Sequence, residues 1–169
     1  MNVLFYLASA VAIVATFLTI TRTNAIHALL YLIVSLLAVA LIFFLLGAPL
    51  AAALEVIIYA GAIMVLFLFA VMVFQLQPDE ENRLADWTRP SLWAGPAIFV
   101  IILGAELLYA LLHFNQQMVS NPSIPPQAVG IALYGPYLLA VELASMLLLA
   151  GLVGAYHLGR QQLDRGGKS

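Results

Sequence analysis

Long runs of apolar residues, separated by short polar segments, dominate this sequence. An α-helix rises about 1.5 Å per residue, so about 20 apolar residues cross a hydrocarbon core roughly 30 Å thick. Five runs reach that length. They predict an all-α integral membrane protein with a single membrane domain over residues 1–169. The predicted helices cover residues 3–20, 26–46, 52–76, 92–113 and 137–158.

The segment between the last two predicted helices differs from the other loops because it is rich in proline. Pro122, Pro125, Pro126 and Pro136 all fall within residues 115–136. Proline removes a backbone donor and restricts the residue before it to extended conformations. The pattern therefore predicts an extended connection rather than a helix.

The basic residues lie in three segments, namely the first loop, the third loop and the C-terminal tail. With five helices these three segments lie on one side of the membrane, and basic residues mark the cytoplasmic side. We therefore predict that the N-terminus is outside and the C-terminus is cytoplasmic. The basic residues are Arg22, Arg83, Arg89, Arg160, Arg165 and Lys168.

Composition excludes several classes of protein. Hydrophobic residues make up 64% of the chain and charged residues 8%, whereas a soluble domain carries about 25% charged residues. The net charge of −2 argues against a nucleic-acid partner. The absence of cysteine removes disulfides and thiolate ligation of metals or iron–sulfur clusters. The three histidines show no metal-binding spacing, and nothing favours the one arrangement that spacing leaves open, a haem held by two histidines on facing helices.

Glu55 stands out because it interrupts the apolar run of the third predicted helix. A carboxylate inside a membrane helix is costly unless it faces protein, water or a partner, and it is by default a candidate functional residue. Tyr59 follows four residues later on the same helical face. Gly61, between Ala60 and Ala62, weakens the local backbone and marks a candidate site for a π-bulge. Two plainer readings stay open: Glu55 caps or snorkels at the outer interface, and Gly61 lets another helix approach closely.

Two further carboxylates, Glu106 and Glu142, fall within predicted helices, in the outer half of the bilayer like Glu55. Such groups can relay protons if hydroxyls or water bridge them, and Tyr59 and Ser145 are available for that. For Glu106 a structural hydrogen bond or a position at the lipid rim is the favoured reading. Glu142 is either a proton carrier or a hydrogen-bond acceptor for a neighbouring helix.

The remaining polar and small residues favour structural roles. His27, His113 and His157 lie near helix ends, where interface histidines are common. On the fifth predicted helix, small residues recur at a spacing of four, which lets helices pack closely. This pattern predicts that the fifth helix is buried against other helices. The pairs are Ala140 with Ala144, Ala150 with Gly154, and Gly151 with Ala155.

Three segments together resemble subunit J of the bacterial proton-pumping NADH:quinone oxidoreductase, respiratory complex I. They are TNAIHALLYLIVSLL (23–37), LEVIIYAGAIMVLF (54–67) and GPYLLAVELASMLLLAG (135–151). The second is the most specific, and the resemblance covers essentially the whole chain. One departure is Ala25, where family members often carry proline, and it concerns only how the second helix starts.

The resemblance implies a five-helix subunit of the bacterial inner membrane that binds no redox centre of its own. FMN, iron–sulfur clusters and quinone are expected in other subunits. The implied neighbours are the subunits A, H and K, the second of which binds quinone, and antiporter-like subunits, besides the lipid bilayer. In the family the third helix carries a π-bulge, here around Tyr59–Gly61, and its relaxation turns the segment with Val65 and Phe67. That rotation is thought to open or close a water path toward carboxylates of subunit K.

The leading hypothesis from the sequence is a gating subunit that couples quinone reduction to proton translocation. Its candidate residues are Glu55, Tyr59, Ala60, Gly61, Val65, Phe67 and Glu142. One alternative is a purely structural or assembly subunit, whose carboxylates only accept interhelical hydrogen bonds. Another is a subunit of a cation/proton antiporter, against which the missing inverted repeat and the lack of an intramembrane lysine argue.

Overall fold

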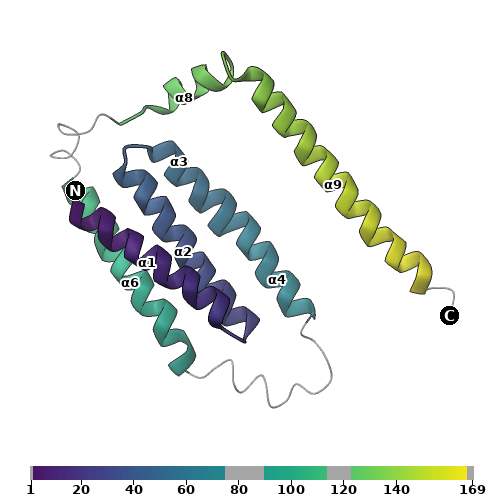
Figure 1. Cartoon of the computed structure of the whole chain (residues 1–169), viewed down its shortest axis with the longest axis horizontal. Coiled ribbons are helices and arrows are strands. Elements are labelled where there is room, and N and C mark those ends of the chain that lie inside the picture. The colour runs from purple at the N-terminus through teal and green to yellow at the C-terminus, as the bar shows by residue number, and fades with distance from the viewer. Residues whose placement is uncertain (1, 75–89, 114–122, 167–169) are drawn as a thin grey trace. The chain divides into compact units, whose positions relative to one another are not determined.

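The computed structural model describes residues 2–74, 90–113 and 123–166, and the described residues form helices and turns without a strand (Figure 1). Five helical stretches in these residues are long and apolar enough to cross a membrane. The prediction of an all-α protein with five membrane helices is thus confirmed. The helices are α1 (Asn2–Thr21), α2 (Ala25–Leu45), α3 (Pro49–Leu54), the π-helix η1 (Glu55–Ile63), α4 (Met64–Phe74), α6 (Pro90–Leu112), α8 (Pro126–Leu133) and α9 (Leu138–Gly166).

The third span consists of α3, η1 and α4 in succession, so it starts at Pro49, three residues earlier than predicted. Proline suits the first turn of a helix because its missing N–H would be unpaired there in any case. The same property makes the prediction for residues 115–136 wrong in part. Pro126 begins the helix α8, although the sequence pattern predicts extended chain there.

Both ends of α2 are fixed by hydrogen bonds that the sequence encodes. At its start Asn24 is the N-cap, and its side chain accepts a hydrogen bond from Ile26 N–H at 3.0 Å. Ala25 is the first helical residue, a position that proline also fits, so its departure from the family pattern leaves the start of the helix intact. At the other end Gly47 has a positive φ of 83°. Its N–H bonds to the Phe44 carbonyl and the next N–H to the Phe43 carbonyl, which is a Schellman motif.

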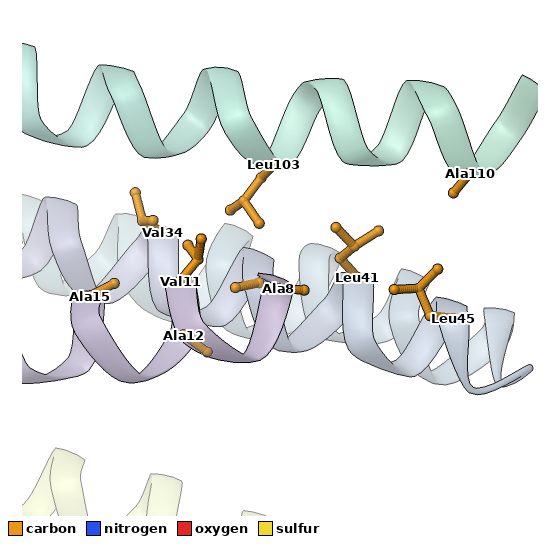
Figure 2. Close-up of a cluster of buried hydrophobic side chains, with 10 residues drawn as sticks. Ala8, Val11, Ala12, Ala15, Val34, Leu41, Leu45, Leu103 and Ala110 are labelled. Atoms are coloured by element: carbon orange, nitrogen blue, oxygen red, sulfur yellow. The ribbon is translucent and has the colours of Figure 1, made fainter. Parts of the chain in front are cut away.

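The chain divides into two compact units, Met1–Pro125 and Pro126–Ser169. In the first unit α2 is the central helix and contacts α1, α3, η1, α4 and α6. Small and branched apolar side chains fill the contact of α1, α2 and α6, as Figure 2 shows. The alanines let the helix backbones approach closely, which is a main source of helix association in lipid. The buried cluster comprises Ala8, Val11, Ala12, Ala15, Val34, Ala38, Leu41, Leu45, Leu103 and Ala110.

A polar contact joins α1 to α2 within this apolar environment. The hydroxyls of Thr16 and Ser35 lie 2.7 Å apart, and both lie within hydrogen-bond distance of the Ala12 carbonyl. Each hydroxyl has one proton to donate, so two protons serve these three contacts. The arrangement satisfies both polar side chains inside the helix pair and fixes the register of α1 against α2.

Tyr31 organises the packing of α2 against α6 near the start of both helices. The side chain is buried, its ring meets the Phe99 ring edge to face at 6.3 Å, and the Arg22 guanidinium lies 5.5 Å from the ring centroid. The tyrosine hydroxyl occupies the space that a side chain at Gly95 would need. Gly95 is therefore required by the close approach of Tyr31.

The second unit consists of α8, a turn and the long helix α9. No residue in the apolar window of α9 is buried within the chain. A Cβ added at Gly151 or Gly154 would meet no atom within 4 Å, so the small residues that predicted helix packing are open within their own unit.

Candidate functional site

The third span is unusual because nine of its residues, Glu55–Ile63, form a π-helix between two α-helical parts. A π-helix places its hydrogen bonds five residues apart and occurs mostly as a single widened turn, often at functional sites. The π-bulge predicted around Tyr59–Gly61 is present, and it extends over a longer stretch than predicted.

Hydrogen bonds mark both ends of the π-helix. At its start the Glu55 N–H points to the carbonyls of Ala51 and Ala52, four and three residues earlier, as in an ordinary α-helix. At its end the Met64 N–H is shared between the carbonyls of Gly61 and Tyr59, three and five residues earlier. The backbone angles of Leu54 and Met64 are α-helical, so the wider winding is confined between two regular helices.

Gly61 is fitted to this winding. A Cβ built there would lie 3.0 Å from the Val56 carbonyl oxygen, closer than an ordinary van der Waals contact. Val56 precedes Gly61 by five residues, the spacing of a π-helical hydrogen bond. No atom of another described helix lies within 4 Å of that Cβ, so within this chain the close-approach reading of Gly61 has no support. A side chain at position 61 crowds the π-helical backbone itself.

The predicted gating residues lie on a surface that the chain leaves open. Tyr59 is 51% exposed, Val65 60% and Phe67 53%, and no residue of η1 is buried. Met64, between them, is buried. One side of this span therefore packs on α2, with which η1 and α4 are in contact. The helices of the first unit leave the other side open.

Glu55 lies where α3 passes into η1, six residues after Pro49 and thus roughly 9 Å along the helix. Its side chain is partly exposed. Among the described residues no hydrogen bond joins it to Tyr59, although the two are four residues apart. The structure thus brings Glu55, Tyr59, Ala60 and Gly61 into one π-helical segment but does not link the carboxylate to the phenol.

Glu142 lies in α9, in the other compact unit, and is exposed. The hydroxyl of Ser145 donates a hydrogen bond to the Glu142 backbone carbonyl at 2.7 Å. The predicted bridging hydroxyl is therefore engaged with the backbone of its own helix rather than with the carboxylate.

The position of Glu106 differs from the one predicted more than that of any other carboxylate in the described helices. It is only 5% exposed, which rules out a position at the lipid rim, and neither carboxylate oxygen has a hydrogen-bond partner among the described residues. The expected structural hydrogen bond is therefore missing as well. Tyr109, its one predicted polar neighbour, stacks on the His113 ring at 4.2 Å and is half exposed. The spacing of Glu106 from Leu103 and Ala110 indicates its burial only once the structure shows those two residues in the core, so the sequence alone carried no signal of it.

An apolar cavity of about 450 Å³ lies between α2, the first half of the third span and α6. Leu103 belongs both to its wall and to the buried core, and Val56 brings η1 into contact with it. The wall contains no ionisable side chain and no hydroxyl. It is lined by Leu37, Ala40, Leu41, Phe44, Pro49, Ala52, Ala53, Val56, Val100, Leu103, Gly104 and Leu107.

Within the described ranges no three residues of the types His, Cys, Asp and Glu come together as a potential metal site. His27 lies near the start of α2, His113 directly after α6, and His157 in the second half of α9. The unusual features of the described chain are thus the π-helix and the unpartnered carboxyl of Glu106.

These features define a multi-pass helical membrane protein with a π-helical segment in its third span. The chain belongs to the NADH-ubiquinone/plastoquinone oxidoreductase chain 6 family, whose sequence model matches residues 15–158.

Individual members of this family resemble the chain over almost its whole length. It is 54% identical to NADH-quinone oxidoreductase subunit J of Escherichia coli strain K12, over 96% of this chain and 88% of that protein. The subunit J of Pseudomonas aeruginosa strain PAO1 is also 54% identical, over 95% and 98% of the two chains. The subunit J of Buchnera aphidicola from Schizaphis graminum is 43% identical, over 96% and 99%.

Proposed function

We infer that this chain is a membrane-arm subunit of a proton-translocating NADH:quinone oxidoreductase, and we propose that its third span acts as a two-state gate. The near full-length similarity to subunit J proteins supports the first statement. The single observation that carries the second is the nine-residue π-helix set between α-helical ends. In this role the chain supplies no redox group, and FMN, iron–sulfur clusters and quinone belong to other subunits.

The gate would work by exchanging π-helical for α-helical winding in η1. A π-helical turn holds one residue more than an α-helical turn between its hydrogen-bonded groups. When the segment rewinds as an α-helix, the helix beyond it turns by about 100°, the angle that one α-helical residue spans. The α4 segment with Val65 and Phe67 would then present different side chains to its surroundings. The helices of the first unit leave both side chains exposed, so what they meet lies outside that unit.

The neighbours that suit this role are the small subunits A and K, the quinone-binding subunit and the antiporter-like subunits, in a bacterial inner membrane. A ligand-driven switch needs two states that differ by only a few kcal/mol and a partner that prefers one of them. Quinone binding or reduction in a neighbouring subunit would supply that preference. The rotation of α4 would then open or close a path for water along the exposed face of the third span.

The direct test is the backbone of η1 in the assembled complex, resolved by electron cryo-microscopy with oxidised quinone and again after reduction by NADH. We expect π-helical winding in one condition and regular α-helical winding in the other, with α4 turned by about 100° between them. The core contact of α1 with α2 serves as the internal reference, since it should not change. The same π-helical winding in every catalytic state would contradict the gate and leave a structural subunit as the better account.

Replacing Glu55 with glutamine distinguishes two hypotheses for the third span, a gate formed by its backbone and a proton relay through the Glu55 carboxylate. Glutamine keeps an acceptor oxygen and removes the titrating proton. If the gate lies in the backbone, proton translocation by the Glu55→Gln complex should fall by no more than about threefold, or less than about 1 kcal/mol. Proton uptake by inverted vesicles during NADH oxidation measures this, with Glu142→Gln as the matched control. A loss of tenfold or more with full assembly would assign proton transfer to Glu55 itself.

A further inference from the structure

Glu106 is enclosed by the chain's own helices. It follows Leu103 by three residues and precedes Ala110 by four, and both of these belong to the core shared with α1 and α2. Figure 2 shows these two neighbours directed from α6 toward α1 and α2. Because residues three and four apart share a helix face, Glu106 lies on the same inward face. Its two oxygens are inaccessible and have no hydrogen-bond partner within the described residues.

No charge of opposite sign faces Glu106 from the helices around it. The helices packed against α6 are α2 and α1, and neither they nor α6 contain lysine or arginine. Their titratable side chains are Tyr6, which is exposed, His27 and Tyr31. The Tyr31 ring contacts Phe99, seven residues and thus roughly 10 Å before Glu106 along α6. His27 lies farther toward the start of α2, and on α6 itself Tyr109 stacks on His113.

An ionised carboxylate in such a place would bear the full cost of leaving water, with no cation or donor to offset it. The protonated acid carries no net charge and avoids most of that cost. We propose that Glu106 is a proton-binding site separate from the third span, and that its carboxyl group holds its proton at neutral pH inside the contact of α6 with α1 and α2. This assignment does not depend on the π-helix acting as a gate.

Because the helices enclose Glu106, they also control how its proton exchanges with water. Water reaches the carboxyl group only if α6 moves away from α1 and α2, or if the side chain swings out of the contact. The apolar cavity beside Leu103 and Leu107 has no ionisable side chain and no hydroxyl in its wall, so a swing of the Glu106 side chain toward it would not provide a polar partner. The proton of Glu106 is therefore bound firmly and released only with a local opening of this helix contact.

Infrared spectroscopy of the full chain tests the proposal. The chain has only eight acidic side chains, so the carbonyl band of one protonated acid can be resolved in a detergent without ester groups. Between about pH 6 and pH 9, where ordinary carboxyl groups are ionised, the wild-type chain should retain one such band. Glu106→Gln should abolish it, Glu106→Asp should retain it at a shifted frequency, and Glu142→Gln should leave it unchanged. After transfer to heavy water the band should shift over minutes or longer.

The outcomes separate the proposal from its rivals. Absence of the band at neutral pH, or its survival in Glu106→Gln, overturns the assignment. In the whole complex, Glu106→Gln should assemble to within about twofold of the wild-type level, because glutamine resembles the neutral acid. Loss of assembly in Glu106→Gln together with retention in Glu106→Asp would instead mean that an ionised carboxylate meets a cation of another subunit, and would equally overturn the proposal.

Discussion

Replacing Gly61 with valine should leave the complex assembled but slow its proton translocation by about tenfold or more. The first atom of the new side chain would press on the Val56 carbonyl oxygen, which lies 3.0 Å from a Cβ at this position. Overpacking of this kind costs about 1–3 kcal/mol, and it falls on the π-helical form alone. If the two forms of the third span differ by only a few kcal/mol, the valine complex stays in the α-helical form. Proton uptake per NADH oxidised, measured in inverted vesicles, reports the loss.

Gly104→Val is the matched control for Gly61→Val. Gly104 is also a glycine in a membrane helix of the same unit, but a Cβ there meets no atom within 4 Å. This variant should translocate protons at close to the wild-type rate. Gly61→Ala should already show most of the loss, since its Cβ is the atom that presses on the Val56 carbonyl oxygen. Normal proton transfer in an assembled Gly61→Val complex would refute the gate, whereas loss of assembly in Gly61→Val alone would point to a structural role of the segment.

The second large effect is expected at Gly95, where alanine should destabilise the chain by up to about 2 kcal/mol. Alanine favours a helix over glycine by about 1 kcal/mol, but its methyl group would collide with the hydroxyl of the buried Tyr31. Overpacking costs about 1–3 kcal/mol and outweighs the gain. Tyr31 has little freedom to yield, because its ring also contacts Phe99 and Arg22. Denaturant unfolding of the purified chain in detergent measures the change.

A double-mutant cycle identifies the cause of this destabilisation. In a Tyr31→Phe background the colliding hydroxyl is gone, so Gly95→Ala should cost clearly less there than in the wild type. Gly104→Ala, on the same helix with open space around the new methyl group, should be neutral or slightly stabilising. An equal cost of Gly95→Ala in both backgrounds would show that the contact with the Tyr31 hydroxyl does not limit this position.

The five membrane helices followed from the sequence because length and apolarity alone decide whether a helix can cross a bilayer. Their ends were harder to place, since proline both stops and starts helices. Pro49 and Pro126 each begin a helix, and the apolar pattern does not distinguish that use from a break. The prediction of extended chain over residues 115–136 is therefore wrong at Pro126.

The π-helix was foreseeable only in part. The run from Glu55 to Ile63 is somewhat less apolar than α4, but polarity alone does not distinguish a π-helical from an α-helical backbone. Gly61 supplied the local hint, through its weak backbone, and the resemblance to a known family supplied the rest. Neither gave the full length of nine residues, which depends on where each backbone N–H finds its carbonyl.

Glu106 could not be placed from the sequence because α6 is apolar all round. Leu107 and Leu108 are exposed while Leu103 is buried, and no polar stripe marks which side faces lipid. The inward side is decided by the alanines of α1 and α2 that admit the helix, for example Ala8 and Ala38. Because burying a carboxylate is costly, the sequence favoured a position of Glu106 at the lipid rim or in a hydrogen bond.

The core of the first unit has a consequence for genetics. Its buried cluster comes from α1, α2 and α6 alone, so a substitution there lowers the folded fraction of each copy by itself. A partner subunit that binds only the folded chain raises that fraction by mass action. Extra copies of a partner gene should therefore suppress core variants in a graded way, the mildest variants first.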